Sequence, residues 1–176
     1  MIANEKTKAA LENALFDLMT KKKFSAIAVS DLVKEAHVAR ASYYRNFSSK
    51  EDIIHSYIER CRSCVARQIN YSEDNTEWLM EQNLITSLNF YKKEQDRFIL
   101  LYQNGFGTKI MDELNWACSE ILGDMPCNSP DRYILYGIVG AAFNIMMQWL
   151  LNIEKDDTNS VAHQILVCIK ALMQEI

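Results

Sequence analysis

The amino-acid sequence predicts an all-α protein of about nine helices. The 176 residues include only two prolines and five glycines, and these residues are the strongest helix breakers. Residues that favour helices, such as Leu, Met, Lys, Glu and Ala, are frequent, and no long alternation of apolar and polar residues marks a strand. Since 49% of the residues are hydrophobic, the chain can bury a sizeable core.

The first 50 residues predict three helices. Apolar residues between Lys6 and Lys22 recur with helical spacing and form one stripe. A short helix follows over 29–36, and a turn at His37 leads into a second short helix over 40–47. Two short helices joined by a tight turn are the geometry of a helix-turn-helix. The stripe of the first helix consists of Ala10, Leu11, Ala14, Leu15, Leu18 and Met19.

Capping signals place the next helices. Ser48 and Glu51 form a capping box, in which the Ser48 hydroxyl caps a new helix that extends to about Val65. Asp74 and Glu77 offer a second capping box, before a helix towards Tyr91. An apolar segment over 98–102 then ends near 104–105.

The last helices are predicted over 110–122, 133–153 and 161–176. Ser129 and Pro130 open the longest of them, because serine is a favoured N-cap and proline is favoured at the first helical position. Residues 133–153 contain no charged residue, and 21 positions are long enough to cross a bilayer. Asn144, Gln148 and two glycines lower the hydrophobicity, so we expect a helix buried between its own domain and a second subunit.

Charge is unevenly distributed along the chain. The net charge is −4, yet residues 1–50 hold nine lysines and arginines against five acidic residues, a net +4. The remainder therefore carries −8. A basic N-terminal part on an acidic body indicates that the first part faces a polyanion.

The second short helix of the helix-turn-helix has the composition of a DNA-reading helix. Arg40 can donate two hydrogen bonds to a guanine edge, and the small Ala41 lets the helix approach the bases. The ring of Tyr43 is expected to pack on thymine methyls, and Lys50 is expected to hold a phosphate with nearby backbone N–H groups. The complete set of expected contacts is Arg40, Ala41, Ser42, Tyr43, Tyr44, Arg45, Asn46 and Lys50.

The stretch "FSAIAVSDLVKEAHVARASYYRNFSSKEDII" resembles the DNA-binding segment of the TetR family of bacterial transcriptional regulators. The resemblance covers about residues 6–60. The positions that match the family pattern are Phe24, Val29, Leu32, Val38, Tyr43, Tyr44, Phe47, Lys50 and Ile53.

The resemblance implies a helix-turn-helix domain over 1–50 and a helical regulatory and dimerisation domain over 51–176. It implies a homodimer through about 133–153 and 161–176, which binds a near-palindromic operator in double-stranded DNA as a repressor. It also implies a small apolar or aromatic effector held in the second domain. The expected liners are Tyr102, Phe106, Met111, Trp116, Phe143 and Met147.

Three positions depart from the family pattern. Ala28 and Ala39 stand where a Ser or Thr normally caps a helix and touches phosphate, and His37 stands at the usual turn glycine. His37 must therefore accept a positive φ or shift the turn. These departures favour a second hypothesis, a co-regulator whose helix-turn-helix docks another protein rather than DNA. A plain ligand-binding helical protein is the third.

The sequence offers no signal for catalysis. It contains no phosphate-cradling glycine loop, nucleophile elbow or zinc-protease motif, so we expect no enzyme, no catalytic residue and no cofactor. Cys61 and Cys64 lie one helical turn apart, but the five cysteines have no framework spacing, and we expect reduced thiols without a metal. The N-terminus does not resemble a signal peptide, so a cytoplasmic protein is expected.

Overall fold

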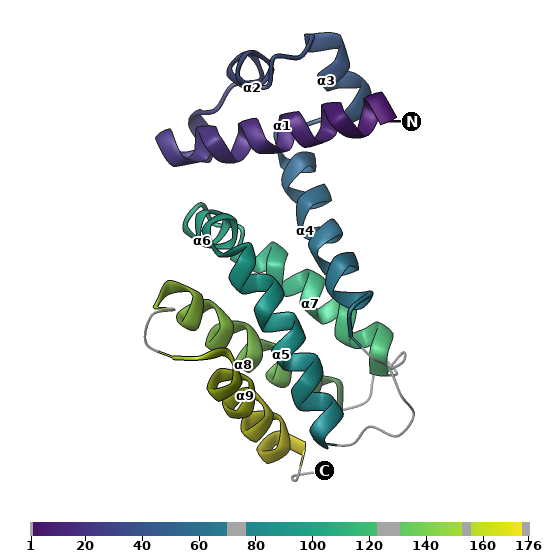
Figure 1. Ribbon diagram of the computed structural model, residues 1–176, viewed down its shortest axis with the longest axis vertical. Coiled ribbons are helices and arrows are strands. Elements are labelled where there is room, and N and C mark those ends of the chain that lie inside the picture. The colour runs from purple at the N-terminus through teal and green to yellow at the C-terminus, as the bar shows by residue number, and fades with distance from the viewer. Residues whose placement is uncertain (1, 70–76, 123–130, 153–155, 174–176) are drawn as a thin grey trace.

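The computed structural model describes residues 2–69, 77–122, 131–152 and 156–173. Within these ranges the fold is all α-helical, with no strand, which confirms the fold class predicted from the sequence. The chain forms a head and a body that lie at opposite ends of the molecule (Figure 1). The expected capping signals at Asp74 and at Ser129 and Pro130 lie outside the described residues.

The head consists of α1 (Ile2–Lys21), the short 3-10 helix η1 (Phe24–Ala26), α2 (Val29–Glu35) and α3 (Arg40–Asn46). α1 packs the predicted stripe against α2, α3 and α4, so that Leu11 and Leu15 are wholly buried while Ala10 is half-buried. Lys21, the last residue of α1, and Lys22, which follows it, form ion pairs with Glu35 and Asp31 of α2. These pairs tie the end of α1 to the helix-turn-helix.

The turn between α2 and α3 is a Schellman motif. The Val38 N–H donates to Val33 O at 3.1 Å and the His37 N–H donates to Lys34 O at 3.2 Å. This motif needs a left-handed residue after the helix, and His37 has φ 52°. Of the two outcomes expected at this position, the protein therefore adopts the positive φ.

α4 (Lys50–Ala66) leaves the head and runs down along the body (Figure 1). Its N-cap is Ser49, whose hydroxyl accepts from the Asp52 N–H at 3.1 Å, while Asp52 accepts from the Ser48 and Ser49 N–H groups. The expected Ser48–Glu51 box is therefore wrong by one residue. Ser49 and Asp52 satisfy the same three-residue spacing, and the helix register decided between the two pairs.

The body consists of α5 (Glu77–Lys93), α6 (Gln95–Gln103), α7 (Gly107–Leu122), α8 (Asp131–Leu151) and α9 (Thr158–Met173). α8 packs along α9 at one edge of the body, and α5 packs on both (Figure 1). α6 ends in a second Schellman motif, in which Gly105 supplies the left-handed residue with φ 87°.

One continuous cluster of buried apolar residues runs from the head through α4 into the body. Tyr57 of α4 is wholly buried, and its ring contacts Phe16 of the head and Phe98 of the body. The boundary expected at residue 50 coincides with the first residue of α4, but the apolar core crosses it. The assignment of residues 1–50 and 51–176 as two domains stays a prediction.

Candidate nucleic-acid interface

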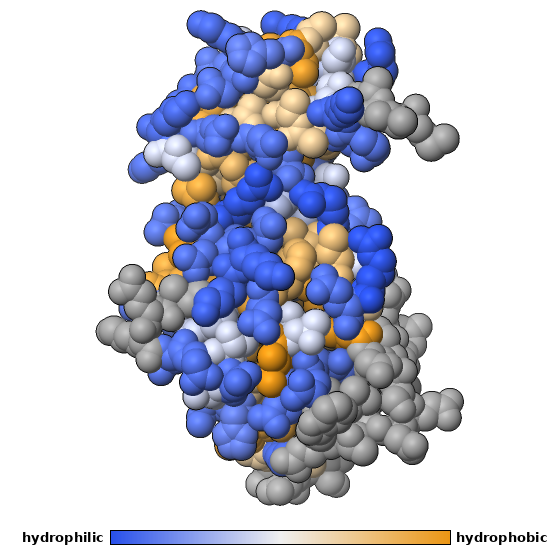
Figure 2. All heavy atoms as spheres, viewed as in Figure 1, coloured by the Kyte–Doolittle hydropathy of each residue, from blue (hydrophilic) through white to orange (hydrophobic). Residues whose placement is uncertain are grey.

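α3 presents a polar, partly basic face to solvent. Four residues of α3 are exposed: Arg40, Ala41, Tyr44 and Arg45. The last three follow Arg40 by one, four and five positions, which places all four on one side of the helix. Tyr44 is 53% exposed and its hydroxyl accepts a hydrogen bond from the Arg40 guanidinium at 3.2 Å. Hydrophilic residues predominate on the visible face of the head (Figure 2). This side of α3 is free to approach a partner of the head.

Tyr43 does not belong to that face. Its side chain is wholly buried and its ring packs edge-on against Tyr44, with centroids 5.1 Å apart, and beside Phe47. Burial raises the pKa of the Tyr43 hydroxyl. The ring therefore anchors α3 to the head, and the expectation that it packs on thymine methyls does not fit its position.

Ser42 and Asn46 are half-buried and interact with each other. The Asn46 side-chain amide donates to Ser42 O at 2.7 Å, which turns the amide back along its own helix. The Asn46 Oδ1 atom is buried without a hydrogen-bond partner. Phosphate binding by Asn46 thus requires a change of side-chain rotamer.

Lys50 is engaged inside the head. Its ammonium group donates to Phe24 O at 2.7 Å and Ile27 O at 2.9 Å, with a longer contact of 3.5 Å to Ser25 O. The same group lies 4.4 Å from the centre of the Phe24 ring. An ammonium group has three donors, and these carbonyls occupy them. Lys50 therefore caps η1, and its expected role as a free phosphate ligand does not fit this arrangement.

Both helices of the motif begin without a hydroxyl cap. Ala28 and Ala39 occupy the two N-cap positions, and neither makes a side-chain cap hydrogen bond. At α2 the Asp31 carboxylate compensates, because it accepts from the Ala28 N–H and from Lys22. The Lys22 hydrogen bond and the Ala28 N–H hold the pKa of Asp31 below its usual value.

Head and body are joined at both ends of α6, and of the residues involved the sequence patterns singled out only Phe24. Arg97 donates to Glu12 at 2.9 Å and to Asn13 at 2.7 Å, and Arg60 of α4 donates to the same Glu12 carboxylate. At the other end of α6, the Phe24 N–H donates to Asn104 Oδ1 at 3.0 Å. Such contacts between distant parts of the sequence leave no local signal in it.

Phe24 also packs edge-on against Phe106, with ring centroids 4.8 Å apart. Phe106 follows Gly105 in the Schellman turn, so the turn aims this ring at η1. Phe106 was expected to line a ligand pocket, and the structure places it in the contact between head and body.

The other expected pocket liners make different contacts. Tyr102 and Phe143 approach each other, with ring centroids 6.4 Å apart, whereas Met147 is wholly buried. Trp116 is 44% exposed and lies under the Arg62 guanidinium, which is 3.6 Å from the ring centre. Met111 is partly buried on α7.

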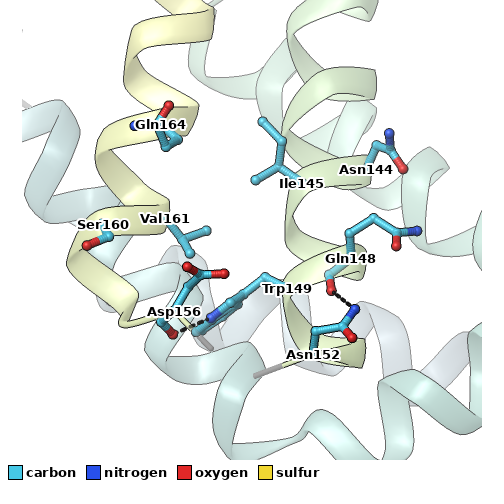
Figure 3. A pocket seen from close by; sticks show the side chains of 9 residues that line it. All are labelled: Asn144, Ile145, Gln148, Trp149, Asn152, Asp156, Ser160, Val161 and Gln164. Carbon is cyan, nitrogen blue, oxygen red and sulfur yellow. Dashed lines mark hydrogen bonds between the residues drawn. The ribbon is translucent and has the colours of Figure 1, made fainter. Parts of the chain in front are cut away.

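A groove of about 560 Å³ lies between α8 and α9, and none of the six expected liners borders it (Figure 3). Its floor includes Trp149, whose indole N–H donates to Asp156 O at 3.0 Å, and Ile145 and Val161 face each other across it. Asn144 and Gln148 lie along its α8 side. The complete lining is Asn144, Ile145, Gln148, Trp149, Asn152, Asp156, Ser160, Val161 and Gln164.

The thiols and acidic groups do not form a metal site in the described part of the chain. No three His, Cys, Asp or Glu side chains group together there. Cys61 is buried, and burial raises its pKa to about 12, so this thiol stays protonated at neutral pH. Cys127 lies outside the described residues.

Residues 13–57 match the family described as bacterial regulatory proteins, tetR family. An uncharacterized HTH-type transcriptional regulator, YxbF, from Bacillus subtilis (strain 168) is 22% identical over 78 residues. That match covers 44% of this chain but only 20% of the relative. The segment that carries the predicted resemblance is thus confirmed as TetR-like.

Solved structures share the whole fold. A TetR transcriptional regulator from Streptococcus agalactiae 2603V has a TM-score of 0.65 at 21% identity, over 95% of both chains. Thermus thermophilus FadR, a TetR-family repressor in complex with lauroyl-CoA, has a TM-score of 0.51 at 13% identity, over 92% of both chains. The head with a helical body, expected from the sequence, is therefore the arrangement of TetR-type regulators.

Proposed function

We propose that the protein is a homodimeric transcriptional repressor that binds a near-palindromic operator in double-stranded DNA. The observation that carries this proposal is the exposed side of α3, where Arg40, Tyr44 and Arg45 stand clear of the head while Tyr43 and Phe47 anchor the helix. A helix held in this way can enter the major groove. The basic charge of residues 1–50 supports the same partner.

Each exposed residue has a role in this proposal. Arg40 reads a guanine edge, and Tyr44 orients it through their hydrogen bond. Arg45 holds a phosphate, and Ala41 allows close approach to the bases. Ser42 and Asn46 take phosphate oxygens after the amide turns outward. Tyr43 and Lys50 position the helix and do not touch DNA.

The second copy is proposed to bind through α8 and α9, which places the two heads about one DNA turn apart. A repressor of this kind acts in the cytoplasm. We further propose that a small apolar or aromatic effector binds in the body near Tyr102 and Phe143, whose rings are adjacent. The acyl-CoA found in the Thermus FadR structure supports an apolar ligand, while Phe106 offers a direct route from such a ligand to η1.

Fluorescence anisotropy with duplexes that tile the DNA flanking the protein's own gene tests the proposal. One near-palindromic duplex is expected to bind at least about 1,000-fold more tightly than scrambled duplexes, and the affinity is expected to fall steeply with salt. Equal binding to all duplexes, or no binding at 50–200 mM salt, contradicts it.

A co-regulator that docks another protein is the second candidate. It is favoured by one observation, the absence of hydroxyls at Ala28 and Ala39, the two helix N-termini where phosphates usually bind. Restoring them with Ala28→Thr and Ala39→Ser separates the two candidates. If the wild type binds no duplex and the double variant gains general, salt-sensitive binding, the docking function is supported.

A further inference from the structure

The exposed side of α3 is chemically suited to two of the four bases. Its residues are Arg40, Ala41, Tyr44 and Arg45, and none of them has a carboxamide or a carboxylate. In the major groove, carboxamides recognise adenine and carboxylates accept from cytosine. The carboxamide of α3, on Asn46, is half-buried and donates to Ser42 O. Guanine and thymine are therefore the bases that this side of α3 matches.

The Arg40 guanidinium is oriented by Tyr44 and keeps donors to spare. Its Nη2 atom donates to the Tyr44 hydroxyl at 3.2 Å, and its central carbon lies 5.6 Å from the centre of the Tyr44 ring. A guanidinium has several further N–H groups in a planar fork, so a pair of them stays available for guanine O6 and N7. In the described part of the chain, no carboxylate forms an ion pair with Arg40. Arg40 is thus held in place with its guanine-binding groups open.

Tyr44 and Ala41 form an apolar surface beside Arg40. Among residues 4–49, Tyr44 is the one exposed large apolar side chain. Its ring packs nearly perpendicular to the buried ring of Tyr43, which fixes its position. Ala41 precedes Tyr44 by three positions, so its methyl group lies next to the ring. Apolar side chains in the major groove contact the C5 methyl group of thymine, and this surface therefore matches thymine.

The spacing of these side chains places the two bases next to each other. Residues one helical turn apart have Cβ atoms about 5–6 Å apart, and successive base pairs are about 3.4 Å apart. We propose that Arg40 binds a guanine while Tyr44 and Ala41 hold the methyl group of a thymine in the adjacent base pair. This inference rests on the proposed DNA binding and names the two bases that α3 reads.

Replacement of each half-site thymine in turn by uracil tests the methyl contact. The operator is first selected from randomised duplexes with the intact protein, and affinities are measured by fluorescence anisotropy. Uracil lacks only the C5 methyl group, so at one position the wild type is expected to bind about 4-fold more weakly. Tyr44→Ser is expected to lose most of this preference, whereas Tyr44→Phe, which keeps the ring, retains it. Arg45→Ala is the matched control, because it weakens all duplexes alike and keeps the preference.

Replacement of each half-site guanine in turn by 7-deazaguanine tests the contact of Arg40. This base lacks the N7 acceptor and keeps its pairing groups. At one position the wild type is expected to bind about 10-fold more weakly, while Arg40→Ala is insensitive to the change there. Tyr44→Phe is expected to show a smaller loss than the wild type, since Arg40 then lacks its orienting hydroxyl. Inosine, which lacks only an amino group in the minor groove, is the control base, with little expected change.

The sensitive thymine and the sensitive guanine are expected in adjacent base pairs. Sensitive bases that are separated, or a preference for thymine that Tyr44→Ser retains in full, overturn the inference and leave DNA binding standing. Equal binding of the thymine and uracil duplexes by the wild type does the same. A selection that enriches no duplex overturns the proposed DNA binding together with the inference. The base analogues act on the wild type itself, so these results do not depend on whether a variant folds.

Discussion

At the scale of single residues, His37 and Gly105 occupy the same position in two Schellman turns. His37 follows α2 with φ 52°, and Gly105 follows α6 with φ 87°. Glycine adopts this conformation freely, whereas a residue with a Cβ is strained there. The turn that orients α3 is therefore strained at His37. The turn that directs Phe106 towards η1 is not strained, because its left-handed residue is Gly105.

His37→Gly is expected to raise the free energy of unfolding by about 1 kcal/mol, because it removes the strain at a positive φ. Urea unfolding followed by circular dichroism measures the change. His37→Ala, which keeps the Cβ, is the matched control and gives no such gain. Gly105→Ala is expected to lower stability by a similar amount, since its Cβ meets nothing and only the backbone is strained. A neutral His37→Gly contradicts this account.

Arg40→Ala is expected to cost about 1–3 kcal/mol of binding at one base pair of the operator and to relax the preference there. Anisotropy titrations against single-base operator variants measure it. Arg45→Ala is the comparison, because loss of a phosphate contact weakens all duplexes alike and lowers the salt dependence. An Arg40→Ala protein with unchanged base preference shows that another residue reads the sequence.

At the scale of elements, the end of α1, the start of α2 and the start of α4 are held by carboxylates. Asp31 accepts from Lys22 and the Ala28 N–H, and Asp52 caps α4 through the Ser48 and Ser49 N–H groups. The Lys22 and Ala28 hydrogen bonds lower the pKa of Asp31 below the ordinary value of 3.8, and the Ser49 hydroxyl together with the Ser49 and Ser48 N–H groups lowers that of Asp52. Asp31 and Asp52 therefore stabilise these helix ends when their carboxyls are deprotonated.

Because the folded-state pKa values are lowered, this stabilisation is present above pH 3.8 and is lost as the pH falls from there through the folded-state values. Asp52→Ala is therefore expected to be less stable than the wild type at pH 7, with the difference shrinking below pH 3.8. Urea unfolding at a series of pH values measures it. A difference that persists unchanged at the acid end shows that the charge of Asp52 contributes nothing.

α6 connects the head to the body through the contact of Arg97 with Glu12. The Glu12 side chain is 13% exposed and the Arg97 side chain is 29% exposed, so water screens this pair only partly. The Arg97 guanidinium also lies over the rings of Phe16 and Tyr57, at 4.8 and 5.4 Å from their centres. These contacts fix α6 against α1 and α4.

A double-mutant cycle with Glu12→Gln and Arg97→Met is expected to give a coupling energy of about 1 kcal/mol for unfolding. The Glu5–Lys8 pair of α1, which is exposed with its atoms 3.7 Å apart, is the control, with an expected coupling of about 0.3 kcal/mol. Equal coupling in both pairs contradicts a special role for the contact between α6 and α1.

At the scale of the whole molecule, the proposed dimer sets the distance between two α3 helices. One continuous core joins each head to its body through α4, so each head follows the position of its body. The two heads are then expected to read half-sites at a fixed spacing.

An insertion of about 5 bp between the half-sites rotates one half-site to the opposite side of the duplex. An insertion of about 10 bp returns that half-site to its original side. The 5-bp insertion is therefore expected to reduce binding to the level of a single half-site. Anisotropy on the original and both inserted duplexes measures the effect. Equal affinity for the original and the 5-bp duplex shows that the heads bind independently.

The sequence alone determined the helices and the helix-turn-helix, because both follow from local periodicity and from residue types at fixed spacing. Four positions of the family pattern are buried in the core of the structure: Phe24, Leu32, Phe47 and Ile53. At His37 the sequence left two outcomes open, a positive φ or a shifted turn, and the structure shows the positive φ. These features depend on neighbours within a few positions of the chain.

The tertiary structure alone decided which side chains of the motif are available to DNA. Tyr43 and Tyr44 are adjacent and chemically identical, yet one is buried and the other exposed, because helical rotation separates them and only packing against α1 fixes which side faces inward. The Lys50 ammonium binds carbonyls more than twenty residues away, and Arg97 binds a helix more than eighty residues away. Such contacts exist only after the chain has folded, since they depend on distances in space rather than along the sequence.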